Sequence, residues 1–287
     1  MVLIATLANK NALQDLDIFL FSLNLWNNLL TTKIYIFCDT YVSQWVKSAY
    51  PLLCIETIVT LDKYDGLNRK QMERMKGHPF LTVWCDLMAE KISLLEYIFQ
   101  NEEITDGIFL MDADICFLGP LPTIPVGTKL ALSPHEIRAQ DTAKFGHYNG
   151  GFLWTCDPAV PPAWVKATTT SRYFEQAALE DIAIPYKENN TLYEFPTTTN
   201  YGWWRLLQGE QPASTLQDSW GIRIGGLCIE GKPLESIHTH WYEATDRATL
   251  TFNQFVLRFL RTVAKKNRKM EKLVRHLEQN IAILRRF

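Results

Sequence analysis

The sequence has no closely spaced cysteine pair, no marked excess of charge and no long apolar run. Its six cysteines are dispersed and none has C-x-x-C spacing, so zinc and thioredoxin-like sites lack support and a reducing compartment is favoured. A formal net charge of −2 gives no electrostatic case for nucleic acid as a partner. The apolar run at residues 1–7 is too short for a membrane span and follows no charged leader. We therefore expect a cytoplasmic protein without a signal peptide or transmembrane helix.

Hydrophobic residues make up 47% of the 287 residues, and charged residues 21%, which allows a large packed core. Apolar strands alternate with amphipathic helices in the first half, as is typical of a parallel α/β sheet. No internal repeat or low-complexity linker divides the chain. We predict one α/β domain, residues 1–248, with a mixed, mainly parallel sheet flanked by helices. A C-terminal helical region, residues 249–287, follows it.

The same patterns locate the individual elements. Strands are predicted at 2–7, 33–38, 53–59, 107–111, 129–133, 149–155, 191–195 and 233–239. Helices are predicted at 12–29, 41–49, 80–100, 161–170, 172–182 and from 249 onward. The strand at 107–111 has almost no polar residue, which indicates a central position covered on both faces.

Two aspartates, Asp112 and Asp114, follow this apolar strand. On an extended chain, side chains two residues apart point to the same face. Ligands of α/β proteins bind at the carboxyl ends of strands, where paired carboxylates suit Mn²⁺ or Mg²⁺. Such a cation can neutralise a diphosphate leaving group. The alternative is a chance surface pair, but the buried strand before the aspartates favours a metal site.

Three further motifs follow in the chain. They are His147–Trp154 (HYNGGFLW), Phe174–Leu179 (FEQAAL) and Glu235–His240 (ESIHTH). With the D-x-D pair, their order resembles the GT-A nucleotide-sugar glycosyltransferases, especially family 8, which includes glycogenin and bacterial galactosyltransferases. The resemblance covers roughly residues 2–245; its motifs are individually loose, but their order and spacing are fairly specific. It implies a GT-A (Rossmann-like) fold and transfer of a sugar from a nucleotide-diphosphate sugar, mostly a UDP-sugar, to a hydroxyl of a glycan or another acceptor.

The resemblance also implies a set of metal ligands. Asp112 and Asp114 match the family's D-x-D ligands, and His238 matches the histidine that completes the shell. His240, on the same strand face, is the alternative to His238. A neutral imidazole among the ligands slightly favours manganese over magnesium.

Donor contacts carry over from the family by position. Lys91 stands where these enzymes usually have a basic residue that reaches the nucleotide-sugar, and a solvated helix position is its alternative. Asn149 has a physical reason as well, because its amide can bind a sugar hydroxyl while the glycines after it allow close backbone approach. Arg247 stands beyond the place of the family's Lys-Pro-Trp, which is missing here, as a candidate cation for the diphosphate. The donor-binding candidates are Ala5, Thr6, Asn9, Asp39, Lys91, Asp112, Ala113, Asn149, Gly150, Gly151 and Arg247.

The catalytic candidates depart from the family pattern. Glu175 and Gln176 align with the family's acid–glutamine pair, but Ala177 replaces the third acid. This replacement leaves retention or inversion of the anomeric centre open. An inverting enzyme needs a carboxylate base near the acceptor hydroxyl, and Glu175, Glu180 and Asp181 are the alternatives.

The C-terminal region is basic, with apolar residues at helical spacing: Met270, Leu273, Val274, Leu277, Ile281 and Leu284. A basic amphipathic helix can lie on an anionic membrane, or pack on the domain with its charged face solvated. The region also offers a surface that would allow two protomers to pair.

Two other functions compete with glycosyl transfer. A nucleotidyltransferase shares the sheet architecture but usually has a Gly-rich basic loop after the first strand, and Ala8–Asn11 is not such a loop. A sugar-binding protein with a decayed active site would lack a metal ligand, whereas both aspartates and two histidines are present.

Overall fold

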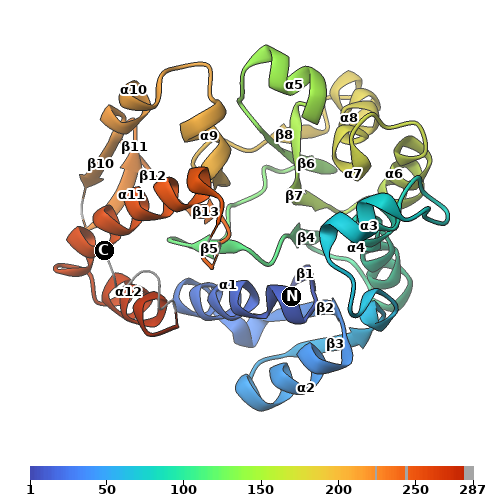
Figure 1. The fold of residues 1–287 in the computed structure, drawn as a ribbon, viewed down its shortest axis with the longest axis horizontal. Helices are drawn as coiled ribbons and strands as arrows, with labels where there is room; N and C mark the ends of the chain where they lie inside the picture. Colours follow the sequence, from blue (N-terminus) through green and yellow to red (C-terminus); the bar gives the residue numbers. More distant parts are fainter. Residues whose placement is uncertain (224, 243–244, 281–287) are drawn as a thin grey trace.

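The computed structural model describes residues 1–223, 225–242 and 245–280 (Figure 1). Its central sheet has seven strands in the order β3-β2-β1-β4-β7-β6-β8. They are β1 (Val2–Ala8), β2 (Thr32–Cys38), β3 (Ile55–Val59), β4 (Ile108–Met111), β6 (Leu130–Pro134), β7 (Tyr148–Thr155) and β8 (Leu192–Glu194). Only β7 runs antiparallel to its neighbours. The predicted α/β class with a mixed, mainly parallel sheet is confirmed.

β4 occupies the middle of this sheet, and all four of its residues are buried, as its composition predicts. It pairs in parallel with β1, with Leu3 opposite Ile108 and Ala5 opposite Leu110. The carboxyl ends of β1 and β4 therefore lie side by side at one edge of the sheet, where ligands of α/β proteins bind.

Helices cover both faces of the sheet. On one face, α1 (Leu13–Trp26) and α2 (Thr40–Ala49) pack on a cluster that includes Ile4 and Ile36. On the other, Leu3 and Ala5 share a cluster with helices α4, α6 and α8. The remaining helices of this half are α3 (Arg69–Arg74), α4 (Val83–Asn101), α5 (Ala139–Phe145), α6 (Val160–Thr168), α7 (Phe174–Ala177) and α8 (Leu179–Glu188), with 3-10 turns η1 (Lys10–Ala12), η2 (Leu29–Thr31) and η3 (Leu61–Tyr64). Because side chains alternate between the two faces along β1, this strand contributes residues to the clusters on both sides of the sheet.

Two small sheets and four helices complete the part of the chain that the structure describes. One sheet is ordered β10-β11-β12 and the other β5-β13-β9. Their strands are β5 (Ile115–Phe117), β9 (Tyr201–Gly202), β10 (Trp220–Arg223), β11 (Gly226–Ile229), β12 (Lys232–Pro233) and β13 (Ser236–His238). The helices are α9 (Trp203–Gln208), α10 (Ala213–Asp218), α11 (Arg247–Ala264) and α12 (Arg268–Asn280).

The apolar face of α12 is buried against the rest of the protein. Met270, Leu273 and Leu277 share a core cluster with residues of α1 and α11, and Figure 1 shows α12 beside α1. Of the two sequence alternatives, packing on the domain is what residues 268–280 adopt, with the basic side chains exposed. Ile281, Leu284 and the two arginines near the C-terminus lie outside the described residues. No described helix is both long and apolar enough to cross a membrane.

Candidate metal and sugar-donor site

The two aspartates lie in a turn between β4 and β5. The sequence predicted an extended segment here, but residues 112–114 are not in a strand, and the Ile115 amide donates to the Asp112 carbonyl at 3.3 Å. After the turn, β5 pairs antiparallel with β13, so that Ile115 lies opposite His238. The turn and this pairing, rather than the strand pleat, bring the carboxylates and the imidazole together.

Asp112, Asp114 and His238 form a compact set of metal-ligating side chains. One ligand atom from each lies within 4.8 Å of the others. His238 Nε2 lies 3.0 Å from Asp114 Oδ1 and 3.9 Å from Asp112 Oδ2. Asp114 and His238 are nearly buried, whereas 34% of the Asp112 side chain is exposed, so the set opens to solvent on one side. Two carboxylates and an imidazole suit Mn²⁺, and also Mg²⁺ if water completes the shell.

Gly151 of β7 forms one wall of this set. A Cβ at this position would overlap the carboxylate of Asp112 and lie 2.6 Å from His238 Cε1. The wall must be backbone because the ligand side chains occupy the space that any side chain would need.

His240 lies between Asp114 and a further carboxylate, that of Asp15, which the sequence did not single out. Its Nδ1 lies 3.2 Å from Asp114 Oδ2 and 3.5 Å from Asp15 Oδ2. Asp15 is buried on α1 and accepts a hydrogen bond from the Trp241 amide at 3.2 Å. No sequence signal marked Asp15, because an acidic residue in the first turn of a helix is ordinary.

The electrostatics of Asp114 depend on both histidines. Burial by itself would raise the pKa of Asp114, but the imidazoles of His238 and His240 hold this pKa below its usual value. The Asp114 charge, helped by the hydrogen bond with Asp15, raises the pKa of His240 to about 10. Burial raises the pKa of Asp15. The acidic turn thus favours the protonated form of His240.

Lys91 of α4 is a buried cation of the site, not a solvated helix residue. Its Nζ lies 3.0 Å from Asp112 Oδ1, 3.0 Å from Glu175 Oε1 and 3.3 Å from the Gly150 carbonyl. Burial by itself would lower the pKa of Lys91, but the two carboxylates outweigh it and raise the pKa. Burial raises the pKa of Glu175 against the opposing effect of Lys91. Glu175 Oε2 is buried with no hydrogen-bond partner among the described residues.

The catalytic candidates fall in different places. Gln176 lies beside Glu175; its Oε1 accepts from the Gly150 amide at 3.2 Å and its Nε2 donates to the Phe145 carbonyl at 2.8 Å. Glu180 instead accepts from the His147 amide and pairs with Arg172, both at 2.7 Å. Of the three alternative bases, the structure brings only Glu175 to the Lys91–Asp112 pair.

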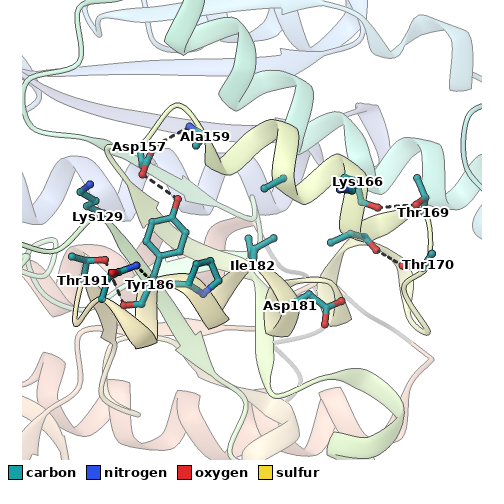
Figure 2. A pocket seen from close by; sticks show the side chains of 14 residues that line it. Lys129, Asp157, Ala159, Lys166, Thr169, Thr170, Asp181, Ile182, Tyr186 and Thr191 are labelled. Atoms are coloured by element: carbon teal, nitrogen blue, oxygen red, sulfur yellow. Dashed lines mark hydrogen bonds between the residues drawn. The ribbon is translucent and has the colours of Figure 1, made fainter.

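Asp181 lines a separate groove between α6 and α8 (Figure 2). The hollow has a volume of about 880 Å³. Lys129, Asp157 and Thr191 also line it, and they border the amino ends of β6 and β8 and the carboxyl end of β7. Because β7 runs antiparallel to β4, this is the edge of the sheet opposite to Asp112.

The donor candidates on the first two strands lie in β1 and in the loops after β1 and β2. Ala5 and Thr6 are fully buried in β1, and the Thr6 hydroxyl has no partner among the described residues. Asn9 caps the short helix η1 by accepting from the Asn11 amide. Asp39 caps α2 by accepting from the Val42 amide at 2.8 Å, and it also accepts from the Lys10 amide at 2.6 Å. Its carboxylate thus ties the loops after β1 and β2 together.

A hollow of about 310 Å³ lies over these loops. It is lined by Lys10, Asn11, Leu13, Gln14 and Tyr41. Tyr41 is 58% exposed at the start of α2, an unusual position for a large aromatic ring, and the sequence did not single it out. Arg247 is exposed in the first turn of α11. The Ala113 side chain is buried and packs into the core instead.

The sheet and the helices that flank it have the GT-A fold that the sequence predicted. The chain is similar in fold to the galactosyltransferase LgtC, solved with donor and acceptor sugar analogs. The identity is 12%, the TM-score 0.52, and 89% of this chain aligns with 94% of that one.

Two longer proteins are also similar in fold. The glycosyltransferase GlyE of Streptococcus pneumoniae TIGR4 shares 13% identity at a TM-score of 0.50, over 88% of this chain and 59% of that one. The bifunctional glycosyltransferase WbbM shares 10% identity at a TM-score of 0.53, over 98% and 52%. The chain therefore spans about three-fifths of GlyE and half of WbbM. No protein-family model and no curated protein sequence matches it.

Proposed function

We propose that this protein is a divalent-cation-dependent glycosyltransferase that moves a sugar from a nucleotide-diphosphate sugar to a hydroxyl of a glycan or another acceptor. The observation that carries the proposal is the convergence of Asp112, Asp114 and His238 at the carboxyl end of the central strand. This set lies on the same fold as the similar glycosyltransferases. A cation bound there supplies a Lewis acid for the diphosphate leaving group.

We place the nucleotide over the ends of β1 and β2. The hollow beside Tyr41 lies over the loop that follows β1, and β1 ends at the same edge of the sheet as β4. An exposed ring of this kind can stack on a base. The buried Thr6 hydroxyl without a partner is a candidate contact for the same ligand. Uridine is the base we propose, on the resemblance to family 8, with manganese as the cation.

Lys91 and Glu175 are the groups proposed to face the transferred sugar. Lys91 Nζ fixes the Asp112 carboxylate on the side away from His238 and holds the Gly150 carbonyl in place. Glu175 keeps an unpartnered oxygen in a buried position, which suits a carboxylate that contacts a hydroxyl or a developing positive charge at the sugar. Gln176 lies next to it with its amide orientation fixed by two backbone groups.

Hydrolysis of a panel of UDP- and GDP-sugars with Mn²⁺ is the experiment that tests this function. We expect one donor to release its nucleotide slowly without an acceptor. Release should stop with a chelator and in the Asp114→Asn variant. The matched control is Asp218→Asn, because Asp218 is exposed at the end of α10 and should not alter release.

Calorimetric titration of the same donors supplies a second readout. Donor binding that requires Mn²⁺ and disappears in Asp114→Asn supports the proposal. If no donor is hydrolysed and none binds, the glycosyltransferase proposal is wrong.

A further inference from the structure

A chain of buried polar side chains leads away from His238. Its Nδ1 lies 3.1 Å from Oδ1 of Asn200, which is fully buried. Asn200 Nδ2 donates to Asn149 Oδ1 and to Ser133 Oγ, each at 3.1 Å. Nε2 of His238 therefore faces the aspartates, and its Nδ1 faces the asparagines.

Two backbone groups fix the direction of this chain. The Gly151 amide, which can only donate, lies 3.0 Å from Asn149 Oδ1. Asn149 Nδ2 then faces His135 Nε2 at 3.2 Å. His135 Nδ1 lies 3.0 Å from the Gly146 carbonyl, which can only accept. Each end independently requires the same orientation of the Asn149 amide.

The orientation of the Asn149 amide determines the orientation of Asn200 and, through it, which nitrogen of His238 carries a hydrogen. Because Asn149 presents its oxygen, Asn200 must present an N–H to it and its own oxygen to His238. His238 Nδ1 must then carry a hydrogen, whichever protonation state the ring has. The reversed Asn200 amide would set oxygen against oxygen at Asn149, a buried mismatch without a donor between the two acceptors.

The ring is also held in place sterically. Trp204 packs edge-on against His238, with ring centroids 5.0 Å apart and an angle of 77°. Trp204 Nε1 donates to the His135 carbonyl at 3.2 Å, so the same aromatic side chain contacts both ends of the chain of side chains. Burial also lowers the pKa of His135 to about 4, which keeps this imidazole neutral and able to accept from Asn149.

We infer that Asn200 and His135 are positioning residues, which pass the orientation set by the Gly146 carbonyl and the Gly151 amide to His238 and reserve its Nε2 lone pair for the cation. The inference rests on the proposed metal-dependent function of the same site. A ring protonated only on Nε2 would donate to Asp114 Oδ1, 3.0 Å away, and would close the site to a cation. We call these side chains, from His135 through Asn149 and Asn200 to His238, the relay.

Nuclear magnetic resonance of protein with ¹⁵N-labelled histidine tests the relay directly. We expect a protected Nδ1–H signal from His238 both without metal and with diamagnetic Mg²⁺, assigned by its loss in His238→Gln. Asn200→Ala should remove this protection. Asn200→Asp, which keeps the acceptor for Nδ1, should retain the signal.

Mn²⁺ affinity is the second readout, measured by electron paramagnetic resonance. Substitution of the hydrogen-bond partner of a metal-bound histidine typically weakens metal affinity about 10–100-fold. We expect Asn200→Ala to weaken Mn²⁺ binding within this range. Asn200→Asp should weaken it less. His135→Leu should have a smaller effect than Asn200→Ala, because the Gly151 amide still orients Asn149.

Asn253→Ala is the matched control. Asn253 is equally buried and makes two hydrogen bonds, to the Thr239 hydroxyl and the His240 carbonyl, but it lies outside the relay. It should leave the His238 signal unchanged and alter Mn²⁺ affinity less than twofold.

Three results would overturn the inference: a His238 ring without a hydrogen on Nδ1, normal Mn²⁺ affinity in Asn200→Ala, or equal weakening in Asn253→Ala. If the wild-type protein binds no Mn²⁺, the proposed function fails, and the Nδ1–H signal still decides the relay. The two failures are thus distinguishable.

Discussion

Gly151 lies directly against Asp112, so that the backbone of β7 forms a wall of the acidic set. A Cβ on Gly151 would overlap the Asp112 carboxylate and approach His238 Cε1 at 2.6 Å. The carboxylate and the imidazole therefore keep their positions only while this residue has no side chain.

Gly151→Ala is expected to impair the site more than the fold. The methyl group should displace Asp112 from His238 and weaken Mn²⁺ binding by about 100-fold, since ligand geometry must be held within a few tenths of an ångström. Calorimetry with Mn²⁺, beside a thermal melt, measures both effects. Gly221→Ala is the control, because nothing lies within 4 Å of a Cβ there. Unchanged affinity in Gly151→Ala would contradict the proposed position of the cation.

The buried Lys91 should be strongly coupled to Glu175. Lys91→Met leaves two carboxylates without their cation, and breaking a buried pair costs about 3–5 kcal/mol of unfolding free energy. Removing the second charge as well, with Glu175→Gln, should recover part of this loss. Urea denaturation of the single and double variants with a chelator present measures the coupling.

An ion pair whose cation is exposed provides the comparison for this cycle. Lys63 pairs with Glu90 at 2.5 Å, but 59% of the Lys63 side chain is exposed. Lys63→Met should cost less than about 1 kcal/mol. Additive effects of Lys91→Met and Glu175→Gln would show that the two side chains are not coupled.

Stability should depend on pH through His135. Burial lowers the pKa of His135 to about 4, from 6.5 for an exposed imidazole. Between these values the unfolded chain binds a proton that the folded chain does not, so the free energy of unfolding falls as the pH falls. The loss begins below pH 6.5 and amounts to roughly 3 kcal/mol once the pH is below 4.

His135→Gln removes this titration while keeping an amide in the relay. Its stability should therefore fall less steeply from pH 6.5 to 4 than that of the wild type in urea titrations. The same slope in both proteins would show that His135 does not take up the proton. His147→Gln, at a half-exposed position, serves as the control and should keep the wild-type slope.

The C-terminal helix α12 should contribute to the stability of the whole fold. Leu273 is fully buried in the cluster shared with α1 and α11. Leu273→Ala is expected to lower the free energy of unfolding by about 2–5 kcal/mol. Lys272→Ala, one residue earlier on the exposed face, should change it by less than about 0.5 kcal/mol. If Leu273→Ala left stability unchanged, α12 would be an appendage that does not support the domain; the proposed boundary at residue 248 would then gain support.

The regular first half of the fold is predictable from its sequence. Short apolar runs mark the strands β1, β2 and β4, and amphipathic patterns mark the helices between them. The composition of β4 correctly indicates its central place in the sheet. Short elements carry no such signal. β5 has three residues, and α9 and α10 have six each, too few for a hydrophobic period to appear.

The site was only partly predictable for the same physical reason. Asp112 and Asp114 stand at positions that local pattern marks, and Lys91 was a candidate only through the resemblance to the family. Asp15 and Asn200 join the site through tertiary contacts, which no local pattern encodes. The sequence predicts one continuous helix where the structure has a break between α7 and α8. The choice among Glu175, Glu180 and Asp181 depends on knowing where this break falls.

The pairing of β5 with β13 has a consequence for tolerance to insertions. His238 faces the aspartates because it lies opposite Ile115, in strands of only three residues each. Neighbouring residues of a strand face opposite sides, so a slip of one position would turn the imidazole away from the turn. A single residue added between Glu235 and His238 should therefore remove His238 from the metal-ligand set even if the chain folds. The geometry of the site thus depends on a pairing that involves three residues of each strand.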